Sequence, residues 1–361
     1  MTPSATVPAR AFERVWGWDL LRGLCALAVA SYHLLLWLDL AALHTLGTHG
    51  VYLFFALSGA SLAYTYGDRL HSARAVAAFL ALRWLRLTPL FAVVAALSVV
   101  MFSARSGEWV DQLPLRFALN LSYAFGFFDP VTWSLPIGGW SLGIEFGYYL
   151  LFPLLALALR WPWLGWSVLL ATAALQAWWI GLTAGAPSGY AANDVAYHQL
   201  PAFGAYFVGG CLIGWWQRQQ PSSWPFGVAL AVWLALGTLL LAFNPAQPGD
   251  QLLGLPGVLL PLACLVAVAV SARARVPAAL QPLAGWMGDI TYGSYLLHPV
   301  LFFSLTWFVL PPLAAGSPWR WLLALAVLVA ACLAAMLSER WLESPVRRWG
   351  RRWTRDRIGP V

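Results

Sequence analysis

Apolar runs long enough to cross a membrane recur along the whole chain. A transmembrane helix needs about 20 predominantly apolar residues to span a hydrocarbon core about 30 Å thick. Short polar or Gly/Pro-rich stretches separate ten such runs. They cover residues 20–38, 50–66, 76–102, 142–159, 163–183, 199–216, 225–243, 251–271, 287–310 and 319–342. This pattern predicts an all-α fold, a polytopic integral membrane helical bundle of about ten transmembrane helices.

Composition supports a membrane protein and excludes a soluble globule. Of the 361 residues, 61% are hydrophobic and only 10% are charged, whereas about a quarter of a soluble domain is charged. We expect a single integral membrane domain over residues 1–361, with an arm at 1–19, a basic tail at 343–361 and no appended soluble domain. Arg22 interrupts the first apolar run, which continues to Leu38, so this run is interpreted as an uncleaved span and not a signal peptide.

The arginines indicate how the bundle is oriented. All 21 basic residues are Arg, and they gather at helix ends and in the tail, which argues against a nucleic-acid partner. If the N-terminus is cytoplasmic, 18 Arg fall inside and only Arg105, Arg116 and Arg320 fall outside. The positive-inside rule therefore predicts that both termini are cytoplasmic. The four cysteines lie in apolar runs, and their spacing builds neither a disulfide frame nor a metal site.

The first span carries ionisable residues that hydrocarbon does not favour. Each costs roughly 2.5–3.5 kcal/mol on insertion scales, so it is a functional-site hypothesis by default. Arg22 and His33 are eleven residues apart, which places them on one helix face, roughly 16 Å apart along the axis. This face resembles the wall of a polar channel. Alternatively, Arg22 reaches the inner surface with Asp19 as its partner, and His33 bonds a neighbouring helix.

Two arginines follow at the inner end of the third span. Arg83 and Arg86 are separated by three residues and therefore share one side of the helix. Guanidinium groups bind phosphate in a bidentate manner, so the pair is a candidate phosphate site. The alternative is an ordinary positive-inside anchor.

Two further polar groups belong to the fourth and ninth spans. Ser141 and Glu145 are neighbours on one helix face, just after Trp140, and Glu145 is the only acid of its span. It is either a functional acid or a structural one bonded to a Tyr or Trp. In the ninth span a stripe repeats every three residues and consists of Asp289, Tyr292, Tyr295 and His298. A structural hydrogen-bond network is the alternative for this stripe.

Taken together, six stretches resemble the acyltransferase 3 family of bacterial membrane proteins. They are "WDLLRGLCALAVASYH", "GVYLFFALSG", "LRWLRLTPLF", "WSLGIEFGYYLLFP", "ITYGSYLLHP" and "ERWLESPVRRW", in family order from the first span to the last. The resemblance implies a ten-helix fold in the bacterial inner membrane. It also implies transfer of an acyl group, usually acetyl, from cytoplasmic acyl-CoA to sugar hydroxyls of envelope glycans such as O-antigen, exopolysaccharide, peptidoglycan or lipid-linked sugars.

The resemblance also assigns roles to individual residues. The family's Arg-x10-His matches Arg22 and His33, its Arg-x-x-Arg matches Arg83 and Arg86, its acid after Trp-Ser-Leu matches Glu145, and its Tyr-x-x-His matches Tyr295 and His298. Three positions depart from the family pattern: Tyr52 replaces a common Asp, Ala60 a common Phe, and Phe146 a second acid. The last change argues against a two-carboxylate mechanism.

We therefore expect a catalytic group, a donor-binding group and a group that contacts the acceptor or the oxyanion. They comprise His33, Glu145 and Arg22; Arg83 and Arg86; and Tyr295, His298, Ser141 and Trp140. His33 acts as general base on the acceptor hydroxyl, or it carries the acyl group itself. No metal and no permanently bound cofactor are expected. The expected partners are acyl-CoA, the glycan acceptor, membrane lipids and an outer-face protein that takes over the acyl group.

Two other functions fit the same polar residues. The bundle could carry a glycan, lipid or acyl group across the membrane without transfer chemistry, although no inverted repeat supports this interpretation. It could also be a scaffold whose buried polar groups only hold helices together. Dependence on acyl-CoA, with release of free CoA, separates an enzyme from a carrier.

Overall fold

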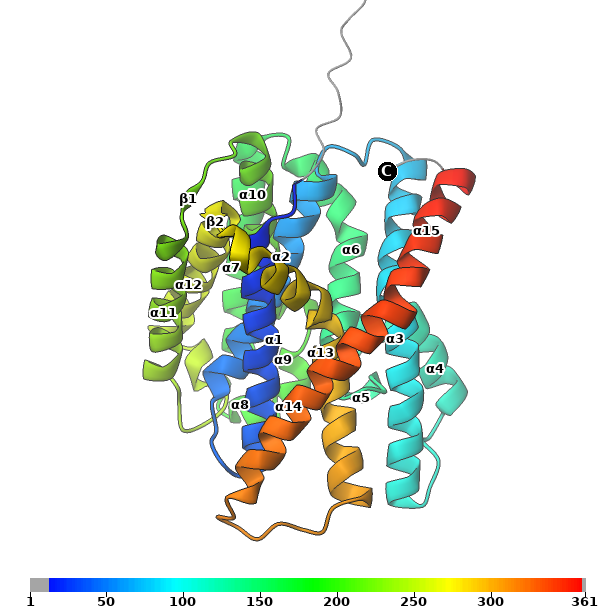
Figure 1. Ribbon diagram of the computed structural model, residues 1–361. Coiled ribbons are helices and arrows are strands. Elements are labelled where there is room, and N and C mark those ends of the chain that lie inside the picture. Colours follow the sequence, from blue (N-terminus) through cyan, green and yellow to red (C-terminus); the bar gives the residue numbers. More distant parts are fainter. Residues whose placement is uncertain (1–12, 359–361) are drawn as a thin grey trace, which may run out of the picture.

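Helices make up most of the computed structural model, which describes residues 13–358 (Figure 1). Hydrocarbon offers no hydrogen-bond partner, so apolar runs fold into helices that satisfy their own backbone groups. The ten long helices each overlap one predicted range. They are α1 (Trp16–Trp37), α2 (His44–Tyr66), α3 (Ala73–Ser106), α6 (Trp140–Ala158), α7 (Pro162–Leu182), α10 (Gly204–Gln219), α11 (Phe226–Ala242), α12 (Pro256–Arg273), α13 (Gln281–Phe308) and α14 (Trp319–Ser338). Residues 1–12 of the predicted arm lie outside the described residues.

Short elements connect the long helices. The helical ones are α4 (Leu113–Ser122), η1 (Ala124–Phe127), α5 (Pro130–Trp133), α8 (Gly189–Ala192), α9 (Asp194–Tyr197), η2 (Leu200–Phe203), η3 (Asp250–Leu252), η4 (Ala278–Leu280), the π-helical turn η5 (Glu339–Glu343) and α15 (Ser344–Arg357). Two short strands, β1 (Trp224–Pro225) and β2 (Ala274–Arg275), pair in parallel, with Trp224 opposite Ala274.

Seven helices in the described part of the chain are long and apolar enough to cross a membrane. They are α1, α2, α3, α6, α7, α12 and the continuous run Trp319–Arg357 that contains α14 and α15. The apolar helix α11 is shorter. Helix α13 is continuous, but the polar residues of its stripe interrupt its apolar sequence. The prediction of an all-α, multi-pass membrane protein is confirmed. The count of ten crossings and the orientation stay predictions.

Both ends of the described chain lie at the same end of the bundle, which we call the terminal end (Figure 1). The α2–α3, α10–α11 and α12–α13 connections lie at this end, and the α1–α2, α11–α12 and α13–α14 connections lie at the opposite end (Figure 1). An even number of crossings produces this arrangement. The terminal end is the one that the arginine distribution predicts to be cytoplasmic.

Small residues let α2 pack closely against α10 at the centre of the bundle. A Cβ atom on Gly210 would lie 2.0 Å from the carbonyl oxygen of Ala56, and one on Gly214 equally close to that of Ala60. Gly59 meets the backbone of Phe207 in the same way. Such close approach is typical of membrane helices, where van der Waals packing replaces the hydrophobic effect between helices. It places one face of α2 against α10 and leaves the rest of its surface to pack mainly against α1 and α12.

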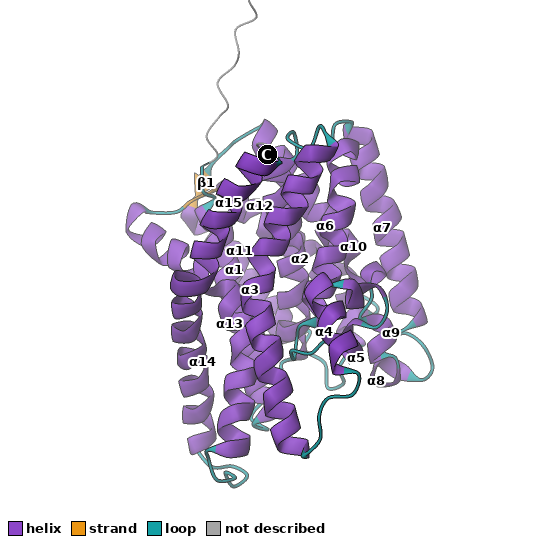
Figure 2. Ribbon diagram, turned by 90° about the vertical axis from the view of Figure 1, so that its right-hand side faces the viewer, coloured by secondary structure: helices purple, strands orange, loops and turns teal. Residues whose placement is uncertain are grey.

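The connection between α3 and α6 folds back along the bundle instead of standing free. Figure 2 shows α4 and α5 beside the long helices. Buried Asn120 holds this segment, since its side-chain amide donates to the carbonyls of Arg116 and Trp133 at 2.8 Å each and accepts from the Leu135 amide at 3.0 Å. The ordered segment brings Gly138 to the side chain of Tyr295.

The C-terminal segment is helical and continues from α14. The π-helical turn η5 follows α14 without a break, and α15 then continues to Arg357. Pro345 is tolerated because it lies in the first turn of α15, where its missing N–H is not needed. Gly350 of α15 packs against Leu85 of α3, so the arginines of the tail lie close to the arginines of α3.

Replacing Gly210 by Ala is expected to destabilise the protein, because the new Cβ atom would overlap the Ala56 carbonyl. Overpacking of this kind costs roughly 1–3 kcal/mol. Gly237→Ala is the matched control, since its added Cβ atom would meet nothing within 4 Å. Thermal unfolding of the purified protein in detergent measures both. Equal midpoints for the two variants would contradict the close α2–α10 packing.

Candidate active site

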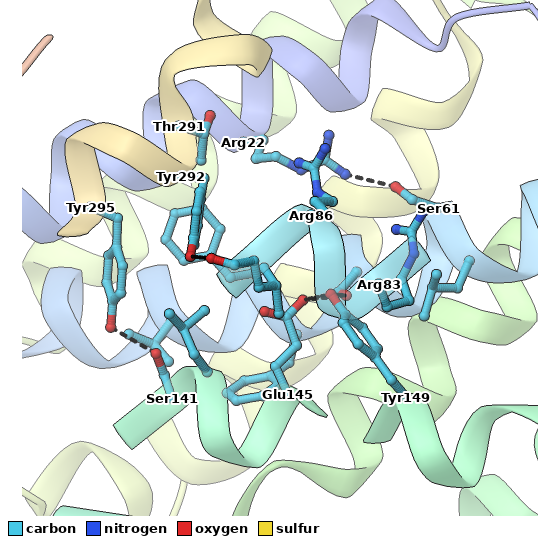
Figure 3. A pocket seen from close by; sticks show the side chains of 17 residues that line it. Arg22, Ser61, Arg83, Arg86, Ser141, Glu145, Tyr149, Thr291, Tyr292 and Tyr295 are labelled. Carbon is cyan, nitrogen blue, oxygen red and sulfur yellow. Dashed lines mark hydrogen bonds between the residues drawn. The ribbon is translucent and has the colours of Figure 1, made fainter. Parts of the chain in front are cut away.

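A cavity of about 260 Å³ lies between α1, α2, α3, α6 and α13. We call it the arginine cavity, because three guanidinium groups and a single acid line it (Figure 3). Its polar lining consists of Arg22, Ser58, Ser61, Arg83, Arg86, Ser141, Glu145, Tyr149, Thr291, Tyr292 and Tyr295. Six of the nine predicted site residues thus meet around one space, and they are Arg22, Arg83, Arg86, Ser141, Glu145 and Tyr295.

Arg22 lines this cavity and is held on its side by α2. Its guanidinium donates to the Ser61 hydroxyl of α2 at 2.7 Å and to the carboxylate of Asp19 at 3.2 Å. Asp19 is itself buried and also pairs with Arg14. The predicted Asp19–Arg22 pair is confirmed, and Ser61 is a partner that sequence spacing did not identify.

Arg83 and Arg86 face the same cavity with unused hydrogen-bonding capacity. Arg83 donates to the Tyr66 hydroxyl at 3.0 Å, but its buried Nε atom has no partner. Among the described residues, no hydrogen bond or ion pair engages the guanidinium of Arg86. With Arg22 nearby and Glu145 as the single acid of the lining, the cavity carries an excess of positive charge. An anionic ligand would compensate that excess.

Glu145 is held by two hydroxyl groups. Its Oε1 atom accepts from the Ser58 hydroxyl at 2.6 Å and from the Tyr149 hydroxyl at 2.5 Å (Figure 3). The alternative that Glu145 is a structural acid predicted a Tyr or Trp partner, and Tyr149 is such a partner. Glu145 nevertheless lines the cavity, so its carboxylate is both anchored and available to a ligand.

A second basic cavity of about 390 Å³ opens from the arginine cavity toward the terminal end. We call it the vestibule. Arg83 and Arg86 line both spaces, and α15 contributes Arg347, Arg351 and Arg355 from the basic tail. Arg347 also forms an ion pair with Glu339. A charged path therefore leads from the surface to the arginine cavity.

A third cavity, of about 260 Å³, lies toward the opposite end, and we call it the histidine cavity. Its polar and aromatic lining is formed by Tyr32, His33, His44, Thr48, Trp140, Tyr190, Asp194, Tyr197, His198, Phe203, Gln251 and Tyr295. No arginine lines it. Val51 and Tyr295 line both this cavity and the arginine cavity, so the two spaces meet at these side chains.

Tyr295 is fixed at this meeting point. Its hydroxyl donates to the Gly138 carbonyl at 2.9 Å and lies 2.9 Å from the Ser141 hydroxyl (Figure 3). Arg22 and His33 were expected to line one channel, and the structure places them in two adjoining cavities that share Tyr295 and Val51 in their lining.

His33 contacts His298 and not the arginines. Its Nδ1 atom lies 3.0 Å from Nε2 of His298, and its ring stacks on Trp37 with a centroid distance of 5.0 Å. Nδ1 of His298 lies 3.1 Å from the carbonyl oxygen of Ser294. His298 is buried and lines neither the arginine cavity nor the histidine cavity. It therefore supports His33 and does not face a ligand.

Sequence reasoning missed a polar group in the α8–α9 segment. His198 packs edge-on against Trp140 at 4.2 Å, and its Nδ1 atom contacts the Asp194 carbonyl oxygen at 2.7 Å and the Asp194 carboxylate at 3.3 Å. Burial lowers the pKa of His198 below its usual range, although Asp194 opposes this shift. His198 is therefore a neutral hydrogen-bonding group near pH 7. Its spacing of four residues from Asp194 was the only signal in the sequence.

The sequence of the chain also matches a known protein family. A family model described as an acyltransferase domain matches residues 15–337. The chain belongs to the acyltransferase 3 family. This acyltransferase 3 protein is accordingly a membrane acyltransferase, and the match extends from α1 through nearly all of α14. No curated protein and no solved structure matches it significantly.

Access to the cavities of this acyltransferase 3 protein can be tested by cysteine labelling. Ser61 lines the arginine cavity and Thr48 the histidine cavity, and both belong to α2. In a Cys332→Ala parent, a membrane-impermeant thiol reagent is expected to label Thr48→Cys in intact cells and Ser61→Cys only in inverted vesicles. The remaining cysteines are buried, so the parent serves as the unlabelled control. Labelling of both positions from one side would contradict the arrangement.

Proposed function

We propose that this protein transfers an acyl group, most simply acetyl, from cytoplasmic acyl-CoA to a hydroxyl of an envelope glycan in the bacterial inner membrane. One observation carries the proposal. A cavity lined by arginine and a cavity lined by histidine approach each other from opposite ends and meet at Val51 and Tyr295. A charged donor and an uncharged acceptor can thus reach one point without either crossing the membrane.

The donor side is suited to the chemistry of CoA. CoA carries several phosphate charges at one end and a thin, uncharged pantetheine arm that ends in the thioester. Arg351 lines the vestibule, and Arg83 and Arg86 line both the vestibule and the arginine cavity. Guanidinium groups match phosphate oxygens in bidentate geometry. The phosphates would stay in the vestibule while the arm extends toward Tyr295.

His33 would act on the acceptor. Its Nε2 atom takes the proton of the sugar hydroxyl, and the oxygen attacks the thioester carbon, so that a C–O bond forms. The tetrahedral intermediate then loses the C–S bond, and the departing thiolate takes the proton from His33. Arg22, on the arginine side, carries N–H groups that would stabilise the oxyanion. The Tyr295 hydroxyl would do so only by exchanging its bond to the Gly138 carbonyl for one to the oxyanion. Glu145 orients Ser58 and Tyr149 in the same wall.

The histidine cavity favours a sugar acceptor. Trp140 and Tyr190 supply aromatic faces, while Thr48, Gln251 and neutral His198 supply hydrogen-bonding groups. Convergent polar groups on an apolar, aromatic wall are typical of small-molecule sites. O-antigen, exopolysaccharide or lipid-linked sugars present such hydroxyls on the outer face, with or without a separate protein that receives the acyl group.

The decisive experiment is on the host envelope. After deletion of the gene, wild type or His33→Ala is restored at matched membrane levels, and the purified glycans are weighed by mass spectrometry. Ester-linked acyl groups are expected to return with wild type. With His33→Ala the rate of acyl transfer is expected to be about 10²–10⁴-fold lower, since a general base contributes that much.

His71→Ala is the matched control for this experiment, because His71 is exposed and lies at the terminal end, away from the cavities. It is expected to restore acylation fully. Acylation that survives gene deletion would refute the proposal and favour the carrier. Full restoration by His33→Ala would exclude His33 as the base.

Two neighbouring arginines of α15 test the donor path. Arg351 lines the vestibule, whereas Arg352 follows it on the same helix and does not. Arg351→Ala is expected to raise the KM for acyl-CoA by about fivefold with kcat unchanged, since an exposed charge contact is worth about 1 kcal/mol. Arg352→Ala removes the same charge and is expected to leave KM unchanged. Equal effects of the two variants would show a general charge effect and no defined site.

A further inference from the structure

The two histidines at the end of the histidine cavity form a chain of hydrogen bonds that runs in one direction. His298 Nδ1 lies 3.1 Å from the Ser294 carbonyl oxygen, and His298 Nε2 lies 3.0 Å from His33 Nδ1. The planes of the two imidazole rings differ by 13°, which suits a hydrogen bond in the plane of both rings. His298 is 1% exposed, so water does not compete for these contacts.

The Ser294 carbonyl decides which nitrogen of each ring carries the proton. A carbonyl oxygen only accepts, so Nδ1 of His298 must be the donor in that contact. The neutral ring then has a bare Nε2 atom, which accepts the hydrogen of His33 Nδ1. The opposite arrangement would place the lone pair of His298 Nδ1 against the carbonyl oxygen. A doubly protonated His298 would bury a charge beside Trp37, which costs several kcal/mol unless it is paired.

The hydrogen bond at Nδ1 of His33 also fixes the protonation of its other ring nitrogen, Nε2. Since Nδ1 of His33 is the donor, Nε2 carries the lone pair, and among the described residues Nε2 makes no hydrogen bond. Trp37 stacks on the ring at 5.0 Å and 7° and prevents it from turning. His33 lines the histidine cavity, so a bare and oriented imidazole nitrogen is available there before any acceptor arrives.

We propose that His298 is a positioning residue that holds His33 in the Nδ1–H tautomer, so that His33 Nε2 is the base that takes the acceptor proton. The use of that base rests on the acyl transfer proposed above, whereas the tautomer does not. When Nε2 gains the proton, His33 becomes a cation whose Nδ1–H bond to His298 strengthens, because charge-assisted hydrogen bonds are stronger than neutral ones. When the thiolate leaves, the proton passes from Nε2 to sulfur, and the starting tautomer returns.

The tautomer can be observed directly by NMR. The chain contains only six histidines, so protein labelled with [15N]histidine in nanodiscs gives a small set of ring signals, and His33→Gln assigns those of His33. We expect wild type to show a protonated Nδ1 and a bare Nε2 for His33. A protonated Nε2 on neutral His33 would overturn the proposal, whatever the catalytic activity.

Two variants of His298 separate its contact with His33 from its contact with Ser294. The amide of Gln reaches about where Nε2 of His lies, whereas the shorter amide of Asn reaches about where Nδ1 lies. His298→Gln therefore keeps a partner for His33, and His298→Asn keeps only the bond to the Ser294 carbonyl. Both variants place one amide group at position 298, so we expect them to fold equally well. Expression yield and thermal unfolding check this expectation.

For acyl transfer we expect kcat of His298→Asn to fall by about 100-fold, near the lower end of what a general base contributes, with KM values for donor and acceptor unchanged. His298→Gln is expected to keep kcat within about fivefold of wild type and to keep the Nδ1–H tautomer of His33 in the NMR spectrum. Equal kcat values for the two variants would overturn the positioning role. A third outcome separates the two proposals. If neither wild type nor the variants transfer acyl groups, but NMR shows the Nδ1–H tautomer of His33, the proposed function fails and the tautomer assignment stands.

Discussion

Hydrocarbon cannot solvate a guanidinium group, and this constraint governs the arrangement of the bundle. Arg22, Arg83 and Arg86 lie in helices that long apolar sequences place in the membrane, and they face an internal cavity and not lipid. The cavity exists because helices from opposite ends of the sequence surround it. Close packing of α2 on α10 through glycine brings α2 into position to offer Ser61 and Ser58 to the arginine and the glutamate.

The charges are distributed unequally between the two ends of the interior. Arginines line the vestibule and the arginine cavity, whereas the polar lining of the histidine cavity consists mainly of histidines and tyrosines, with Gln251 and a single acid, Asp194. This asymmetry is what a membrane acyltransferase requires if its donor is anionic and its acceptor neutral. The border is narrow, because Val51 and Tyr295 contribute to both walls.

Helix α13 links these regions. Tyr292 and Tyr295 face the arginine cavity, while His298, one turn further along, supports His33. The Tyr292 hydroxyl donates to the Leu87 carbonyl of α3 at 2.5 Å, and Tyr295 bonds the segment before α6. One helix thus contributes to the arginine cavity, to its meeting point with the histidine cavity at Tyr295, and to the support of the candidate base His33. Its polar stripe is both the structural network and the framework of the site.

The sequence by itself determined the all-α membrane fold, the family and six of the polar residues around the arginine cavity. These properties depend on the length of apolar runs and on spacings within single helices, such as the Asp19–Arg22 pair and the Arg83–Arg86 face. Only the tertiary structure decided that Arg22 and His33 line different cavities, that α15 adds arginines to the vestibule, and that His33 pairs with His298, 265 residues away. Such contacts depend on how helices far apart in the chain cross one another, and no local periodicity encodes those crossings.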